Sequence, residues 1–169
     1  MANFDIELVG KIGSMALIDR EYQDMNYNII ARLSRELRPG YIWVTSGATE
    51  IGRLDYIKRT GKELRGTDEE NKTDYSAQGQ SILMQTYRQY IDSRFSVRQI
   101  LVEHQHFNDA EKRKHLFEML CRCPGQNAIP IVNYNDPVSD EENRKHEIIK
   151  VRAERGKAIE LSLIHISEP

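Results

Sequence analysis

The sequence has no long apolar segment, few cysteines and almost no net charge. Its longest apolar run covers five residues, Ala128 to Val132, whereas a membrane-spanning helix needs about 20. Two cysteines, Cys121 and Cys123, stand too close together to frame a disulfide-stabilised fold, so we expect free thiols. The 24 basic and 26 acidic side chains leave a net charge of −2. This balance argues against a protein held to nucleic acid by bulk charge.

The remaining composition predicts an ordinary folded domain. Of 169 residues, 39% are apolar and 30% are charged, which is enough apolar material for a core and too little net charge for a disordered chain. The opening residues, MANFDIELV, have neither a basic segment nor an apolar core, so we expect no signal peptide. Together with the free cysteines, this favours a cytoplasmic protein without a membrane partner.

The last nine residues, LSLIHISEP, follow a charged segment and match no structural period. They resemble a translated sequencing adapter, because the adapter stretch CTGTCTCTTATACACATCTCCGAGCCC translates codon by codon to Leu161 through Pro169. A native strand is the alternative interpretation. We expect residues 161–169 to be an adapter-derived tail and leave them out of the fold prediction.

Short β-branched or aromatic segments alternate with segments of helical spacing. We predict strands at 4–9, 41–45, 97–102 and 128–132, and helices at 24–37, from 49, at 75–95, from 108 and at 139–160. Residues 59–74 are polar and are predicted to form a loop. Asp24 and the segment 108–111 are candidate helix N-caps. The alternation predicts an α/β three-layer sandwich with a mainly parallel sheet and helices on both faces, with no second domain boundary.

Three of the four predicted strands end in small or polar loops, at 10–14, 46–48 and 133–136. In open parallel sheets, ligands bind beyond the carboxyl ends of the strands. Glycines let backbone N–H groups approach an anion, and a lysine adds a mobile positive charge. Each loop taken alone is equally compatible with an ordinary turn. Their joint placement at strand ends favours a shared site.

Several other chemistries are disfavoured. Neither GxxxxGK[ST] nor GxGxxG occurs at the first strand, which excludes a P-loop or a Rossmann dinucleotide site. His104 and His106 stand two residues apart without a third ligand at a clear spacing. We therefore predict packing or solvated histidines and no metal site. Trp43, inside a predicted strand, is expected in the core.

Five segments, in this order, carry a resemblance to a known family: LVGKIGSMAL, IWVTSGATEIGR, SAQGQSILMQTY, VRQILVEHQHFND and IPIVNYNDPVSDEE. Together they resemble the amino acid kinase superfamily over roughly residues 6–142. The Ser-Gly-Ala after the second strand is similar to the branch that acts on glutamate, whereas other branches carry Gly-Gly-Gly-type loops there. The chain departs from the family pattern at Met15 and Tyr134, which weakens the substrate assignment more than the fold.

The resemblance implies ATP-dependent phosphorylation of an amino acid carboxylate. The most specific form is conversion of glutamate to glutamyl 5-phosphate at the start of proline biosynthesis, with ATP and Mg²⁺ as cofactors. Such a transfer needs in-line positioning and cancellation of negative charge. The implied partners are small molecules, with no nucleic acid, and a homo-oligomer is expected for the full-length protein.

The resemblance also assigns roles to residues at the three strand ends. Lys11 would be the catalytic lysine that contacts the phosphates, and the backbone of Gly13 and Ser14 would donate N–H groups to them. A substrate carboxylate would lie on the loop after the second strand, and the substrate ammonium on the loop after the last. The substrate-binding residues implied in these two loops are Ser46, Gly47, Ala48, Asn135 and Asp136.

The family's second catalytic lysine and its adenine-binding half have no counterpart in this sequence. We therefore expect residues 1–160 to be the N-terminal, acceptor-substrate part of an amino acid kinase domain, and this chain alone to be inactive. Two alternatives stay open: a uridylate-kinase-like member of the same superfamily, and a non-catalytic member that binds a small ligand or regulates a partner.

Overall fold

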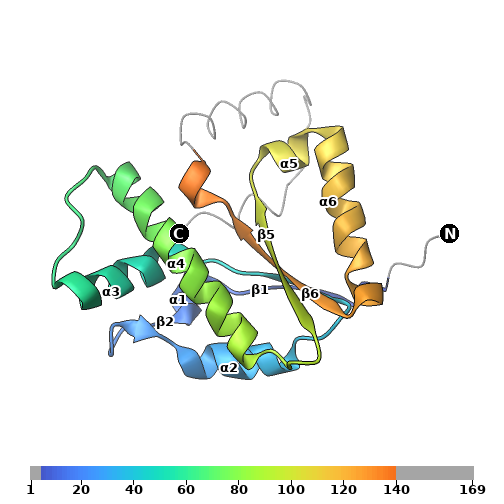
Figure 1. The fold of residues 1–169 in the computed structure, drawn as a ribbon, viewed down its shortest axis with the longest axis horizontal. Coiled ribbons are helices and arrows are strands. Elements are labelled where there is room, and N and C mark those ends of the chain that lie inside the picture. The colour runs from blue at the N-terminus through green and yellow to red at the C-terminus, as the bar shows by residue number, and fades with distance from the viewer. Residues whose placement is uncertain (1–4, 140–169) are drawn as a thin grey trace.

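Four parallel strands form the central sheet of this protein, whose computed structural model describes residues 5–139 (Figure 1). They are β1 (Leu8–Lys11), β4 (Tyr41–Val44), β5 (Ser96–Val102) and β6 (Ala128–Tyr134), in the spatial order β1-β4-β6-β5. All three strand pairs are parallel. The α/β class, the mainly parallel sheet and the existence of all four predicted strands are thereby confirmed. The helix predicted at 139–160 and the tail at 161–169 lie outside the described residues, apart from Ser139.

Helices connect these strands, and a small hairpin adds a second sheet. The helices are α1 (Ser14–Leu17), α2 (Tyr27–Glu36), α3 (Ala48–Thr60), α4 (Asp68–Tyr90), α5 (Gln105–Asn108) and α6 (Ala110–Arg122). Short 3₁₀ turns η1 (Pro124–Gln126) and η2 (Asp136–Val138) flank β6. The hairpin pairs β2 (Ile18–Asp19) with β3 (Asp24–Met25) in antiparallel fashion, and the sequence pattern did not predict it.

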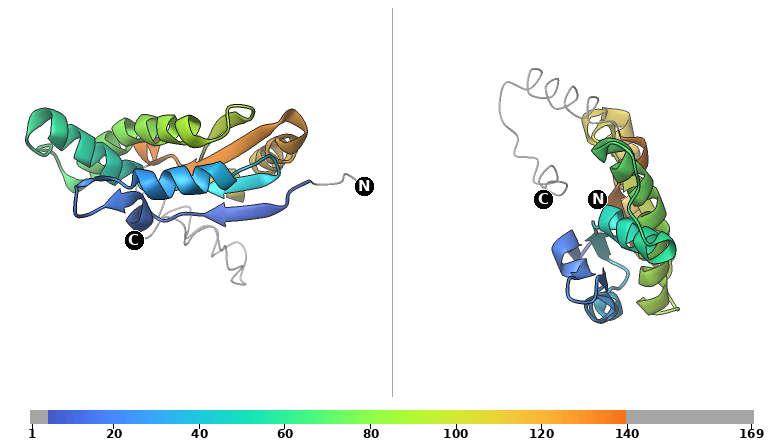
Figure 2. Two further views of the ribbon diagram at one scale, coloured as in Figure 1. Left: turned by 90° about the horizontal axis from the view of Figure 1, so that it is seen from below. Right: turned by 90° about the vertical axis from the view of Figure 1, so that its left-hand side faces the viewer.

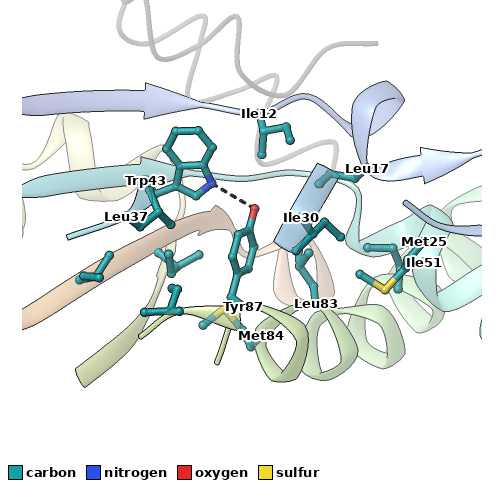
Figure 3. Close-up of a cluster of buried hydrophobic side chains, with 13 residues drawn as sticks. Ile12, Leu17, Met25, Ile30, Leu37, Trp43, Ile51, Leu83, Met84 and Tyr87 are labelled. Atoms are coloured by element: carbon teal, nitrogen blue, oxygen red, sulfur yellow. Dashed lines mark hydrogen bonds between the residues drawn. The ribbon is translucent and has the colours of Figure 1, made fainter. Parts of the chain in front are cut away.

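The main core lies between one face of the sheet and the helices α2 and α4 (Figures 2 and 3). Side chains alternate along a strand, so every second residue points to this face. The strands contribute Trp43, Ile129 and Ile131, while α4 contributes Leu83 and Tyr87, all of them buried. The predicted core position of Trp43 is confirmed.

The end of α6 packs near the opposite face of the sheet. On β5, Val97 packs against the main core, so its neighbour Arg98 points the other way. The Arg98 guanidinium donates to Gln126 Oε1 at 2.6 Å and lies 3.7 Å from the Sγ of Cys123, the C-cap of α6. Helices therefore lie on both sides of the sheet, as the three-layer prediction requires.

The first strand was predicted at 4–9, but it begins at Leu8 and ends at Lys11, so that a glycine lies inside it. Gly10 was assigned to the loop, yet β1 continues to Lys11. A Cβ at Gly10 would lie 2.3 Å from the ring of Trp43 on the neighbouring strand. Only glycine lets β1 pair beside this indole, so the residue marks close packing and not a turn.

Two predicted helix starts were wrong by two or three residues. The helix predicted from Asp24 begins at Tyr27, and its N-cap is Asn26, whose side chain accepts from the Ile29 N–H at 3.2 Å. Asp24 lies in β3 and forms an ion pair with Lys58. The helix predicted from 108 begins at Ala110 behind the cap residue Asp109, and 105–108 form the separate short helix α5.

The predicted loop at 59–74 is much shorter in the structure. Helix α3 continues to Thr60 and ends at Gly61, which adopts a left-handed conformation with φ 72°. Helix α4 already begins at Asp68, because Thr67 and Glu70 form a complete capping box. The first turns of α4 are polar, so no apolar periodicity indicated this start. Its predicted end was also wrong, since α4 stops at Tyr90 and not at 95.

Candidate functional site

The carboxyl ends of all four parallel strands meet along one edge, where backbone hydrogen bonds join them. The Ile12 N–H donates to Val44 O at 2.9 Å, and the Thr45 N–H donates to Val132 O at 2.9 Å. The Asn135 N–H donates to Val102 O at 2.9 Å. These bonds extend the pairing beyond the strands themselves, so the three predicted loops lie at one edge of the sheet, as expected.

The loops after β1 and β4 are in direct contact. Gly47 adopts φ 92°, and a Cβ there would lie 3.4 Å from Ser14 Cα and 3.4 Å from Leu17 Cδ1. The Ser46 hydroxyl donates to Ile12 O at 3.3 Å. Glycine suits position 47 twice, because of its left-handed backbone and because of this close approach. The structure therefore places Gly13 and Ser14 beside Ser46 and Gly47.

Gly47 is also the N-cap of α3, a helix of 13 residues that begins at Ala48. Its cap has no side-chain hydrogen bond, so the first N–H groups of α3 meet no capping side chain. Such groups, with the positive end of the helix dipole, favour an anion. Lys11, exposed at the end of β1 and paired with Val44, adds a positive charge at the same edge.

The loop after β6 is held by two side chains that the sequence pattern did not identify. Asn135 Nδ2 donates to Glu103 Oε1 at 2.8 Å, across the ends of β6 and β5. Asp136 Oδ1 lies 3.9 Å from Lys72 Nζ on α4, and the Asp136 side chain is 20% exposed. Glu103 and Lys72 are thus charged neighbours of the predicted residues. They come from elements distant in sequence, so periodicity alone could not associate them.

A buried polar network lies beneath the loop after β4. Trp43 Nε1 donates to the Tyr87 hydroxyl at 3.1 Å, as Figure 3 shows, and Thr45 Oγ1 lies 2.9 Å from the same oxygen. Burial raises the pKa of Tyr87 above its ordinary value of 10. Because these side chains satisfy one another's hydrogen bonds away from water, they hold the end of β4 against α4.

A second buried pair, Gln80 and Asn133, joins α4 to the end of β6. Asn133 Nδ2 donates to Gln80 Oε1 at 2.8 Å, and the two side chains are 4% and 7% exposed, respectively. The sequence analysis assigned neither residue a role. A signal existed for Gln80, since it lies in a segment that carries the family resemblance, next to Gly79.

His104 and His106 follow β5 at the carboxyl edge of the sheet, whereas Cys121 and Cys123 lie at the end of α6. His104 is 8% exposed and its ring lies 5.4 Å from that of Tyr134, while His106 Nδ1 accepts from the Glu103 N–H at 2.9 Å. Cys121 and Cys123 are free thiols, as predicted. Across residues 5–139, no group of three His, Cys, Asp or Glu side chains is placed to hold a metal ion.

The helices within residues 5–139 include none with the length and apolar character needed to cross a membrane.

The fold and the site define a class of protein. Beyond the carboxyl ends of a parallel α/β sheet lie two contacting loops that contain glycine, the exposed Lys11 and a polar Asn-Asp turn. This arrangement is consistent with the fold of amino acid kinases.

Comparison with known proteins identifies the relatives. The chain is 31% identical over 151 residues to glutamate 5-kinase of Alkaliphilus metalliredigens, an alignment that covers 85% of this chain and 55% of the relative. It is 32% identical over 142 residues to glutamate 5-kinase 1 of Bacillus licheniformis, covering 80% of this chain and 38% of that protein. Glutamate 5-kinase of Geobacillus thermodenitrificans is 31% identical over 141 residues, covering 80% and 37%. The chain thus resembles the N-terminal part of glutamate 5-kinase.

The chain spans about half of the first of these relatives and less than two fifths of the other two. No protein-family model matches it.

Proposed function

We propose that this chain carries the acceptor-substrate site of an ATP-dependent amino acid kinase whose acceptor is glutamate. The reaction would transfer the γ-phosphoryl group of ATP to the side-chain carboxylate, giving glutamyl 5-phosphate and ADP, at the start of proline biosynthesis. The similarity to glutamate 5-kinases supports the substrate. The observation that carries the site is the contact between the loops after β1 and β4, where Gly47 meets Ser14.

The edge formed by the loops after β1 and β4 suits the reacting groups. Lys11 would contact the phosphates, with N–H groups of Gly13 and Ser14 beside it. Phosphoryl transfer needs little covalent assistance and depends on positioning and on charge stabilisation. The start of α3, formed by Ser46, Gly47 and Ala48, would hold a substrate carboxylate. Its contact with the β1 loop would bring acceptor and phosphate together.

The Asn-Asp turn after β6 suits the other end of an amino acid. Asp136 would bind the substrate α-ammonium, and the carbonyl of the Asn135 side chain would accept from the same group. Asn135 Nδ2 donates to Glu103, so its Oδ1 is directed away from that carboxylate. Lys72 near Asp136 offsets the negative charge of this turn.

ATP and Mg²⁺ are the cofactors that this function requires. The residues at the edge of the sheet fit a phosphate group, because they offer one ammonium and several backbone donors. Bound Mg²⁺ would neutralise charge on the ATP phosphates. Because the alignments cover only 37–55% of these relatives, we expect this chain to bind the acceptor and not to turn over ATP by itself.

Calorimetric titration of the purified chain with glutamate tests the proposal. We expect saturable binding of glutamate and none of UMP. Asp136→Asn should weaken glutamate binding by about 10- to 100-fold, because a hydrogen bond to a charged group contributes about 1.5–3 kcal/mol. Asp74→Asn, an exposed carboxylate on α4, is the matched control and should bind normally. Binding of UMP without glutamate would refute the proposal in favour of a uridylate-kinase-like protein.

A further inference from the structure

Gln80 is placed by a close contact between α3 and α4. Its neighbour Gly79 lies against the first turn of α3, where an added Cβ would be 1.8 Å from Ala48 O. Gln80 itself reaches Asn133 at the end of β6. Gln80 thus follows the residue that contacts the start of α3, and its side chain reaches the end of β6.

The hydrogen bonds determine which way the Gln80 amide faces. Asn133 Oδ1 accepts from the Tyr134 backbone N–H at 2.8 Å, and a backbone N–H is always a donor. Asn133 must therefore donate through its Nδ2, and Gln80 must accept through its Oε1. This chain of bonds removes the usual ambiguity between amide oxygen and nitrogen. Gln80 Nε2 is left as the group directed away from Asn133.

Gln80 Nε2 is buried and has no acceptor among residues 5–139. The side chain is only 7% exposed, so bulk water does not serve as its partner. Buried donors without acceptors are costly and rare in folded proteins, and each one calls for a partner. The partner that fits is an oxygen acceptor that enters between α3 and β6.

We propose that Gln80 Nε2 donates a hydrogen bond to the substrate carboxylate held at the start of α3, and so selects an amino acid with an oxygen acceptor there. This assignment rests on the proposed function. A neutral donor suits this position, because it adds specificity without an unpaired charge in a buried place. A ligand that lacks this carboxylate would leave the donor unpaired.

Replacement Gln80→Glu separates the two halves of the amide. The remaining carboxyl oxygen can still accept from Asn133, while the donor becomes a second oxygen that repels a carboxylate. We expect the titration with glutamate to show binding weakened at least tenfold. Gln85→Glu, an exposed glutamine on the same helix, makes the same chemical change and should bind as the unmodified chain does. Equal affinity for Gln80→Glu and the unmodified chain would overturn the proposal while leaving the proposed function intact.

Two further measurements distinguish a contact with substrate from a loss of structure. γ-Aminobutyrate lacks the α-carboxylate and 2-aminobutyrate lacks the side-chain carboxylate. Gln80→Glu should bind the analogue that keeps the contacted carboxylate more weakly than the unmodified chain does. Its affinity for the other analogue should change by less than twofold. Equal weakening of both would show a general structural effect and refute the contact. If Gln80→Glu does not fold, Gln80→Met, of similar length and uncharged, is expected to give the same selective loss. Failure of the unmodified chain to bind any amino acid would refute both proposals.

Discussion

Gly52 and Gly79 lie against each other where α3 crosses α4. A Cβ at Gly79 would be 2.6 Å from Gly52 N and 1.8 Å from Ala48 O, and a Cβ at Gly52 would be 1.8 Å from Tyr75 O. All three neighbours are backbone atoms, which cannot move aside as a flexible side chain can. This contact sets the position of α4, and with it that of Gln80, relative to the start of α3.

Gly79→Ala should therefore destabilise the protein, although alanine is the better helix former. The new methyl group would force the two helices apart, and overpacking of this kind costs about 1–3 kcal/mol. Urea unfolding measures the change. Gly125→Ala, where an added Cβ meets nothing within 4 Å, is the control and should change stability by less than about 0.5 kcal/mol. Equal effects of the two variants would contradict the close contact.

Removal of the Tyr87 hydroxyl should destabilise the fold by about 2 kcal/mol. In Tyr87→Phe, the buried Trp43 N–H loses its acceptor and Thr45 loses a partner. The expected result is a lower midpoint of urea unfolding with an unchanged slope. Tyr22→Phe alters a side chain that is 73% exposed and should leave the midpoint in place. An unchanged midpoint for Tyr87→Phe would show that the network contributes nothing.

Thr67→Ala removes the N-cap of α4 and should cost about 1 kcal/mol. The Thr67 hydroxyl accepts from the Glu70 N–H at 3.2 Å, and Glu70 Oε2 accepts from the Thr67 N–H at 2.8 Å. Urea unfolding, supported by amide hydrogen exchange of the first turn of α4, measures the loss. Ser81→Ala on the exposed face of α4 is the comparison. Faster exchange confined to residues elsewhere would contradict the cap.

The Asp92 carboxyl should titrate with a pKa of about 2, because hydrogen bonds from the Arg94 side chain and backbone N–H stabilise its charged form. The folded state then binds fewer protons than the unfolded state, whose Asp pKa is about 4. This contribution to stability is present above about pH 4 and is lost as the pH falls toward 2. NMR titration of the carboxyl carbon measures the pKa. Arg94→Ala should raise it part of the way back, since the backbone donor remains, and an unaltered pKa would refute the assignment.

Local sequence features were sufficient to predict the sheet and the meeting of three loops at one of its edges. The β-branched and aromatic composition of 41–45, 97–102 and 128–132 identifies strands wherever they come to lie. A parallel sheet brings the carboxyl ends of its strands to one edge, so loops 10–14, 46–48 and 133–136 could be grouped before any contact was known. The ends of helices were harder to predict, because the cap residues Asn26 and Thr67 stand among other polar residues that could equally serve as N-caps.

Only the tertiary structure decided which side chains support the site. Glu103, Lys72 and Gln80 come from other elements, and their contacts with Asn135, Asp136 and Asn133 join residues that are 32, 64 and 53 positions apart. Such contacts leave no period in the sequence, since they depend on how helices pack on the sheet. Gly10 and Gly52 illustrate the same limit. From the sequence alone, these glycines could equally belong to turns. Only the packing of the folded chain shows that they make room for an indole ring and a backbone carbonyl.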